Sequence, residues 1–384
     1  MRACWLLCFA LLTACGSSDD SSPGGGGSGA VGGAGGAGGN AGSGGSAGSA
    51  GAAGSSACAL LDEKLQAALE GARTKTGSRD AALAVTTPEC GTKSYVSGDS
   101  GLTGAELFRI GSVTKTYVAA VILRLVGAGK LSLDDHLDKW VSGVPNGDAI
   151  SVRMLLNHTS GIFNYTEDAG FLGDLQKKWT PDELVALAAA HGAVNPPGTT
   201  WKYSNTNYVC LGIIAEKVAG SAIAQQIRAE LLTPNQLAHT FFDGQEPLGD
   251  PLAPGFSQLG TEVTTAVDPS GPWAAGAMTA TVADTARWIE LFGSGAVVSP
   301  ALAAEVEKGE SVAPNVSYGL GMMMLEAAIT AGAGKAYGHN GSINGYHTQA
   351  FHFRDTKTSI VSVVNQDGAN PNDVTLAALQ TLFP

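Results

Sequence analysis

Apolar positions follow two different spacings, one at the chain ends and another in the middle. Period-two alternation or a β-branched run predicts strands at both ends, and leucine spacing predicts a helix before the first strand and after the last. The strands are expected over Ala81–Thr86, Thr92–Ser97, Gly345–Phe353 and Ser359–Val364, and the helices over Ala59–Thr76 and Leu376–Leu382. The first two strands are close enough in sequence to form a hairpin.

The middle of the chain, Ser112–Leu291, predicts helices separated by turn signals such as VPNGD, NPPGT and DPSGP. An economical arrangement is an antiparallel sheet formed from both chain ends, flanked by helices, with a large all-helical insertion. This is an α/β fold of the α+β type. We expect an α/β part at about 58–125 and 300–384, and a helical part at about 126–299.

The first 57 residues do not have the composition of a folded domain. Residues 1–14 are typical of a secretory signal that ends in a lipobox, and Cys15 would be lipidated. A short buried helix or a membrane span is the weaker interpretation, because the apolar run is too short to cross a bilayer. Residues 15–57 predict a Gly/Ser/Ala tether. We therefore expect a lipid-anchored envelope protein that faces the periplasm or the extracellular surface.

Charge and cysteine content limit the partners and the compartment. The net charge of −12 lacks the basic footprint of a nucleic-acid binder, and we expect a monomer that meets the membrane only through its anchor. In an oxidising compartment, three cysteines outside the predicted signal and anchor imply one pair and one free thiol. We predict a bridge between Cys58 and Cys90, with Cys210 buried in a helix. Three unpaired cysteines remain the alternative.

Three other common kinds of site find no support. The seven histidines include no HExxH pair, the cysteines have no zinc-type spacing, and GxxxxGK[ST] is absent, so no metal or cofactor is expected. Gly44–Gly48 fits GxSxG but lies inside the tether, without the strand and helix that a nucleophile elbow requires. We interpret it as an accident of composition.

One serine lies in a more informative context. Ser112 and Lys115 form Ser-x-x-Lys at the start of an apolar helix, which places both side chains on one face, one turn apart. Free N–H groups in the first turn would favour an oxyanion there. The alternative is that Ser112 is only an N-cap and Lys115 is solvated. This alternative agrees poorly with a helix that is apolar on nearly all sides.

Two further motifs supply partners for this serine. Tyr203-Ser204-Asn205 follows a proline-glycine turn, and a tyrosine near a buried lysine can have a lowered pKa and act as a general base. His339-Asn340-Gly341 directly precedes the alternating strand, and a glycine there lets backbone approach a ligand. Taken alone, the tyrosine motif is more simply interpreted as an aromatic residue of a turn that packs on the core. Taken alone, the histidine motif is more simply interpreted as a turn before a strand.

Together, these motifs resemble the serine penicillin-recognising hydrolases, which comprise secreted actinobacterial-type D-alanyl-D-alanine carboxypeptidases, class C β-lactamases and related esterases. The resemblance covers nearly all of Cys58–Pro384. Beyond the motifs it extends to GKLSLDDHLDKW, ISVRMLLNHTSGI, PGTTWKYSNTNYVCLGIIAEKVAG and WAAGAMTATVADTARW.

The resemblance implies a role for each site residue. Ser112 would be the acylated nucleophile, Lys115 would assist its deprotonation, and Tyr203 would act as general base and acid. The remaining expected contacts are Asn205 to the substrate amide, the N–H groups of Ser112 and Ser342 as oxyanion hole, His339 where relatives have lysine or histidine, and Asn340 where relatives use threonine to contact a carboxylate. Trp273 and Phe171 would line the cleft, and His158 would be structural.

The resemblance leaves several functions open. The leading hypothesis is a D-alanyl-D-alanine carboxypeptidase-like enzyme acting on peptidoglycan stem peptides. The alternatives are an esterase or amidase, a class C-like β-lactamase, and a module that binds wall fragments or penicillin without turnover. Recognition of a substrate carboxylate would need a cation near the motif His339-Asn340-Gly341, and between Val312 and Asn340 only Lys335 qualifies. A solvent-facing Lys335 would therefore favour the esterase or amidase.

Overall fold

The computed structural model describes residues 49–384, and Leu61–Pro384 form one compact unit. The predicted signal peptide, Cys15, the Gly44–Gly48 motif and the tether up to residue 48 lie outside the described residues. The first helix, α1 (Ser49–Thr76), begins inside the stretch expected to be tether.

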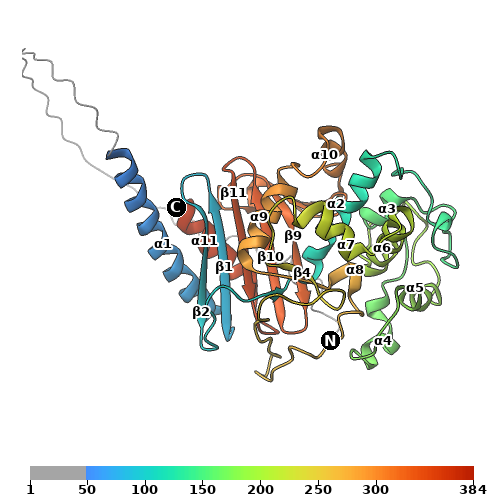
Figure 1. Cartoon of the computed structure of the whole chain (residues 1–384), viewed down its shortest axis with the longest axis horizontal. Coiled ribbons are helices and arrows are strands. Elements are labelled where there is room, and N and C mark those ends of the chain that lie inside the picture. The colour runs from blue at the N-terminus through green and yellow to red at the C-terminus, as the bar shows by residue number, and fades with distance from the viewer. Residues whose placement is uncertain (1–48) are drawn as a thin grey trace, which may run out of the picture. The chain divides into compact units, whose positions relative to one another are not determined.

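Helices and strands follow one another as the two chain ends predict, with more strands than expected (Figure 1). The strands are β1 (Asp80–Thr87), β2 (Gly91–Gly98), β3 (Phe108–Arg109), β4 (Thr240–Phe242), β5 (Met278–Ala280), β6 (Glu310–Ala313), β7 (Val316–Tyr318), β8 (Met323–Leu325), β9 (Ala336–Ile343), β10 (Tyr346–Phe353) and β11 (Thr358–Val364). The α-helices after α1 are α2 (Thr114–Gly127), α3 (Val152–Leu156), α4 (Ala169–Gly173), α5 (Pro181–Ala189), α6 (Asn205–Ala219), α7 (Ile223–Ile227), α8 (Trp273–Gly276), α9 (Val282–Gly293), α10 (Pro300–Val306) and α11 (Pro371–Leu382).

The main sheet joins the two ends of the chain, as predicted. Its strand order is β2-β1-β11-β10-β9-β8-β7-β6, and every neighbouring pair is antiparallel. The N-terminal strand β1 pairs with the C-terminal strand β11, with Ala81 opposite Val364 and Val85 opposite Ile360. The predicted antiparallel sheet flanked by helices is therefore confirmed.

Both faces of this sheet are covered, because side chains alternate along its strands. On β1, Ala82 and Ala84 face a large core shared with α2, α6 and α9. Leu83 and Val85 face a smaller core, to which α1 contributes Leu65 and α11 contributes further apolar residues. Figure 1 shows α11 and α9 beside the sheet and the helical part next to it.

Several strands lie where the sequence predicted none. β6, β7, β8 and β9 precede the first strand expected in this half of the chain. The motif His339-Asn340-Gly341, which was expected just before a strand, lies within strand β9. Two glycines inside β9 weaken its apolar alternation, so only pairing with β10 reveals the strand. The middle region also contains a small sheet of order β3-β5-β4.

The described cysteines agree with one pair and one free thiol. Cys58 and Cys90 are each disulfide-bonded. Cys210 is a buried free thiol on α6, and burial raises its pKa to about 12. Within residues 49–384 no single helix is long and apolar enough to span a membrane, although α6 and the bent continuation Ile223–Leu232 pass that test together.

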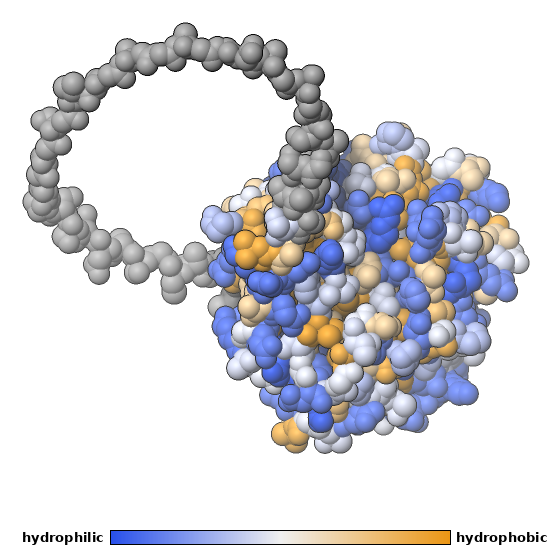
Figure 2. Space-filling model, turned by 60° about the vertical axis from the view of Figure 1, so that its left-hand side comes forward, coloured by the Kyte–Doolittle hydropathy of each residue, from blue (hydrophilic) through white to orange (hydrophobic). Residues whose placement is uncertain are grey.

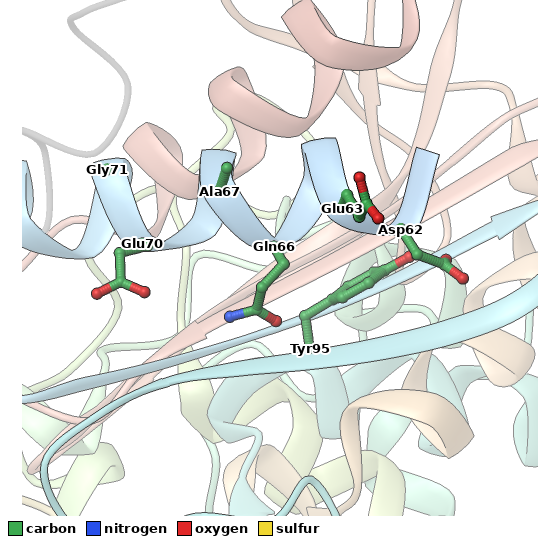
Figure 3. A pocket seen from close by; sticks show the side chains of 7 residues that line it. All are labelled: Asp62, Glu63, Gln66, Ala67, Glu70, Gly71 and Tyr95. Carbon is green, nitrogen blue, oxygen red and sulfur yellow. The ribbon is translucent and has the colours of Figure 1, made fainter. Parts of the chain in front are cut away.

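A surface hollow lies between α1 and β2, on the side of the sheet covered by α1 (Figure 3). Its lining includes the acidic residues Asp62, Glu63 and Glu70, and Tyr95 donates a hydrogen bond of 2.6 Å to Asp62. None of the motif residues lines it. The face drawn in Figure 2 shows hydrophilic residues interspersed with small hydrophobic areas.

Candidate active site

Ser112 is held in a short 3₁₀ turn, Gly111–Val113, that leads directly into α2. This turn lies against β9. A Cβ on Gly341 would come within 1.9 Å of the Ile110 carbonyl oxygen and 3.2 Å of Ser112 N. A Cβ on Gly111, whose φ of +51° favours glycine, would come within 2.7 Å of Ser342 N. Both glycines are therefore needed to bring the backbone of Ser112 and Ser342 together.

Lys115 is fully buried one helical turn later, and its Nζ contacts three oxygen atoms. These are Ser112 Oγ at 3.0 Å, Asn205 Oδ1 at 2.7 Å and the Ala275 carbonyl oxygen at 2.7 Å. Burial holds the pKa of Lys115 well below its usual value. The amine is thus positioned to accept a proton from the serine hydroxyl.

Tyr203 approaches the same serine from another part of the chain, with its hydroxyl 2.8 Å from Ser112 Oγ. The expected lowering of its pKa is wrong, because packing around the phenol raises this pKa. Burial also lowers the pKa of Lys115, which weakens the positive charge that was expected to lower the pKa of the phenol. Tyr203 in the resting site is therefore a hydroxyl donor.

These contacts form a consistent hydrogen-bond chain when all three groups are neutral. The phenol of Tyr203 donates to Ser112 Oγ, the serine hydroxyl donates to the Lys115 amine, and the amine donates to Asn205 and Ala275. No donor is left over and no buried charge arises. Ser112 is therefore ready to lose its proton to Lys115 while Tyr203 still holds one to give away.

The side-chain oxygen of Asn205 accepts a hydrogen bond from Lys115 and so orients this lysine. Its Oδ1 accepts from Lys115, its Nδ2 donates to Thr166 Oγ1 at 3.1 Å, and only 5 % of the residue is exposed. The role expected for Asn205, a hydrogen bond to the substrate amide, stays a prediction.

A cluster of aromatic rings packs against Tyr203. The ring of His158 lies 4.3 Å from that of Tyr203, and its Nδ1 accepts from the Ser204 N–H at 3.2 Å. Burial lowers the pKa of His158, so the ring is neutral. The structural role expected for His158 agrees with this placement.

His339 completes the same cluster from β9. Its Nε2 lies 2.9 Å from Tyr318 Oη, and burial lowers its pKa to about 3. A histidine that is neutral at physiological pH supplies no cation to the site. Asn340 and Ser342 lie on the opposite face of β9 from His339, and the Ser342 side chain is exposed.

The two aromatic residues expected to line the cleft belong to the core. Trp273 is 5 % exposed, and its ring packs where a Cβ on Gly212 of α6 would lie 2.8 Å away. Phe171 is equally buried and makes an edge contact with the Tyr165 ring at 4.9 Å. An aromatic side chain in an apolar stretch most often packs internally, and contact of either residue with a substrate stays a prediction.

Lys335 does not place its charge near the motif His339-Asn340-Gly341. Its Nζ forms an ion pair of 2.9 Å with Glu326, and both side chains are almost half exposed. It precedes the first residue of β9, so seven strand positions, or roughly 20 Å, separate it from Ser342. The only cation that sequence offered in this stretch therefore faces solvent.

Sequence reasoning missed some supporting groups. The Ala275 carbonyl accepts a hydrogen bond from Lys115, and no sequence motif marks such a backbone acceptor. It lies two residues after Trp273, a non-glycine residue with a φ of +34°. Tyr318 and Tyr208 were not singled out, although Tyr208 donates to Leu156 O at 3.0 Å and lies in the same cluster. Within residues 49–384 no group of three or more His, Cys, Asp or Glu side chains is placed to hold a metal ion.

The site thus unites a serine hydroxyl, a buried amine and a phenol between a sheet and a helical part, which is the set of groups that nucleophilic catalysis by a serine requires. The chain matches the family model named Beta-lactamase over residues 65–383. It belongs to the Beta-lactamase family, the group of serine hydrolases that its motifs resemble.

Similar proteins carry several activities in their names. A D-stereospecific amidohydrolase from Streptomyces sp. is 33 % identical, with a TM-score of 0.74 over 82 % of this chain and 97 % of the other. Penicillin-binding protein 4 of Amycolatopsis lactamdurans is 33 % identical over 45 % of each chain. Esterase EstB of Burkholderia gladioli is 31 % identical over 37 % of this chain and 40 % of its own. The chain spans less than half the length of these two curated relatives.

Proposed function

We propose that this protein hydrolyses small amides or esters through an acyl-enzyme on Ser112. The observation that carries the proposal is the double contact on one oxygen: Lys115 Nζ and Tyr203 Oη both lie within 3.0 Å of Ser112 Oγ. One neighbour accepts the serine proton and the other holds a proton for the leaving group. Both are needed to expel an amine.

The reaction follows from these positions. Ser112 Oγ attacks the substrate carbonyl carbon as its proton passes to Lys115, and the oxyanion lies between the N–H groups of Ser112 and Ser342. Tyr203 then protonates the leaving nitrogen or oxygen as the bond to the acyl carbon breaks. A water returns a proton to Tyr203 as its oxygen attacks the ester, and Lys115 returns the first proton to Ser112.

Two observations favour an amide or ester over a peptide with a free carboxylate. Lys335 is engaged by Glu326 in solvent, and His339 is neutral. The relatives named an amidohydrolase and an esterase support the same substrate classes.

A D-alanyl-D-alanine carboxypeptidase-like or β-lactamase activity is the second candidate. The relative named penicillin-binding protein 4 supports it, as does the predicted anchor at Cys15, which would hold the enzyme in the envelope beside peptidoglycan. A non-catalytic binding module is disfavoured, because the intact serine, lysine and tyrosine are arranged for turnover. The anchor itself is tested by metabolic labelling with a fatty acid, in which Cys15→Ser should lose the label.

The proposed function is tested with the full chain and three probes: a p-nitrophenyl ester, D-phenylalanine amide and a fluorescent penicillin. We expect ester and amide turnover that Ser112→Ala abolishes and the exposed Ser94→Ala leaves intact. A long-lived penicillin adduct on Ser112 without amide turnover would favour the second candidate. Amide and ester turnover that survives in Ser112→Ala would overturn the assignment of the nucleophile.

A further inference from the structure

His158 lies just after α3 and holds both chain neighbours of Tyr203. Its backbone carbonyl accepts the Lys202 N–H at 2.9 Å, and its side-chain Nδ1 accepts the Ser204 N–H at 3.2 Å. The imidazole also packs on the phenol ring of Tyr203, with ring centroids 4.3 Å apart. One residue therefore fixes the backbone on both sides of Tyr203 and contacts its side chain.

The hydrogen bonds around the imidazole determine which nitrogen faces Ser204. Asn207 Nδ2 also lies 3.2 Å from His158 Nδ1, and the Ser160 hydroxyl donates to Asn207 Oδ1 at 2.6 Å, so the amide turns its NH2 group towards the ring. A backbone N–H and an amide NH2 group can only donate, which makes Nδ1 an acceptor. Because burial lowers the pKa of His158, the ring is neutral and its proton lies on Nε2.

Packing alone does not explain a histidine at this position. His158 is fully buried, and among residues 49–384 its Nε2 has no hydrogen-bond partner, so the ring buries a polar atom that an apolar side chain would not have. Its φ of +63° lies in the left-handed region, which is unfavourable for most residues other than glycine. Such strain is concentrated at functional sites. The contact that an apolar side chain could not make is the one from Nδ1 to the Ser204 N–H.

The backbone of Tyr203 has no secondary structure to fix it. Residues 201–204 belong to neither a helix nor a strand, so no helical or sheet ladder of hydrogen bonds holds them. Tyr203 Oη nevertheless lies 2.8 Å from Ser112 Oγ, and in the proposed reaction it gives its proton to the leaving group. A displacement of about 1 Å can lower a catalytic rate by about 10²-fold. The two bonds from His158 therefore take the place of the missing ladder.

We propose that His158 positions the phenol of Tyr203 for proton transfer to the leaving group. Its carbonyl and Nδ1 hold the backbone so that the phenol proton passes to the leaving oxygen or nitrogen as the bond from that atom to the acyl carbon breaks. The inference rests on the proposed function and deepens it. His158 acts through Tyr203 and is a positioning residue. A purely structural residue would affect every step alike, whereas a positioning residue affects the step that uses this proton.

Two esters of one acid separate these roles: p-nitrophenyl butyrate and ethyl butyrate. p-Nitrophenolate leaves without a proton, whereas ethoxide needs one from Tyr203. Both esters form the same butyryl-enzyme, so the ratio of their kcat/KM values compares only the steps up to release of the leaving group. Because both values come from one preparation, partial loss of folded protein does not change the ratio.

The variants His158→Gln and His158→Asn are compared on the full chain. In histidine and asparagine the acceptor atom is bonded to Cγ, whereas in glutamine it lies one bond further out and cannot replace Nδ1. Asparagine also tolerates a positive φ. We expect the ratio of ethyl to p-nitrophenyl ester to fall about 10²-fold in His158→Gln and to recover most of this loss in His158→Asn. The exposed His239→Gln is the control and should leave both kcat/KM values unchanged.

A double variant shows whether His158 acts through the phenol. Tyr203→Phe alone should lower the ratio, because the proton donor is lost. Adding His158→Gln should then lower it no further, since effects of residues that act in one step are not additive. Asn207→Leu removes one of the two donors at Nδ1 and should lower the ratio roughly threefold, which keeps the test decisive when His158→Gln does not fold.

The outcomes separate this inference from the function on which it rests. An equal loss with both esters in His158→Gln, a loss that asparagine does not restore, a further loss in the double variant or an unchanged ratio in Asn207→Leu would overturn the role of His158. Each of these results leaves the chemistry of Ser112 standing. Turnover that survives in Ser112→Ala, or no turnover of either ester or of D-phenylalanine amide, would overturn the proposed function itself.

Discussion

The two halves of the site differ in how they treat polar groups. Around Lys115 every partner is enclosed: the amine, Asn205 and Ala275 satisfy one another with almost no exposure to water. Around Ser342 the polar groups lie at the surface, where Ser342, His347 and Asp367 form an open chain. The enclosed half lowers the pKa of Lys115 through burial, whereas the polar groups of the open half remain close to water. Substitutions in the enclosed half should therefore have the larger effect on rate and on stability.

The largest effect is expected from Lys115→Met. Loss of the proton acceptor should lower kcat/KM by about 10³-fold or more. It also leaves Asn205 Oδ1 and Ala275 O without a donor, so the free energy of unfolding should fall by about 2–4 kcal/mol. Ester kinetics and urea unfolding measure the two effects, with the exposed Lys64→Met as control. Normal turnover in Lys115→Met would place the base elsewhere.

Tyr203→Phe should separate protonation of the leaving group from attack. The ring keeps its contact with His158, so stability should change by less than about 1 kcal/mol. Amide turnover should fall by roughly 10²–10⁴-fold. A p-nitrophenyl ester should be affected less, because p-nitrophenolate leaves without a proton. Tyr95→Phe, on the far side of the sheet, is the matched control, and equal losses on both substrates would contradict this role.

The buried His339 should make stability depend on pH. Its folded-state pKa is lowered to about 3, so between that value and about 6.5 the unfolded chain binds the additional proton. Unfolding therefore becomes easier as pH falls through this window, with a slope of about 1.4 kcal/mol per pH unit from this residue. His339→Gln should flatten the slope measured by urea unfolding at pH 4–7. An unchanged slope would mean that other histidines, such as His158, carry the dependence.

The smallest effect is expected from Lys335→Ala. An exposed ion pair contributes about 0–1 kcal/mol, so stability should barely change. KM for N-acetyl-D-alanyl-D-alanine should change by less than about twofold, as expected for a residue roughly 20 Å along the strand from Ser342. A tenfold rise in KM would show that Lys335 reaches the substrate carboxylate and would favour the carboxypeptidase candidate.

Much of the framework could be predicted from local patterns. Alternation in β1, β2 and β10 and the apolar helix after Ser112 depend on backbone periodicity, which is visible in a short window of sequence. β9 escaped this approach because its glycines remove the side chains on which periodicity depends. The burial of Trp273 also escaped this approach, because composition does not tell which face of a short helix packs inward.

By itself, the sequence determined that Ser112 and Lys115 share one helical face, that both chain ends supply one sheet, and that Tyr203 and His339 belong to recognisable motifs. These features follow from covalent spacing and local backbone geometry. Only the tertiary structure decided the lowered pKa of Lys115, the raised pKa of Tyr203, the ion pair of Lys335 in solvent, and the contacts among Ser342, His347 and Asp367. Proton affinity depends on burial, and burial depends on residues far apart in the chain that only folding brings together.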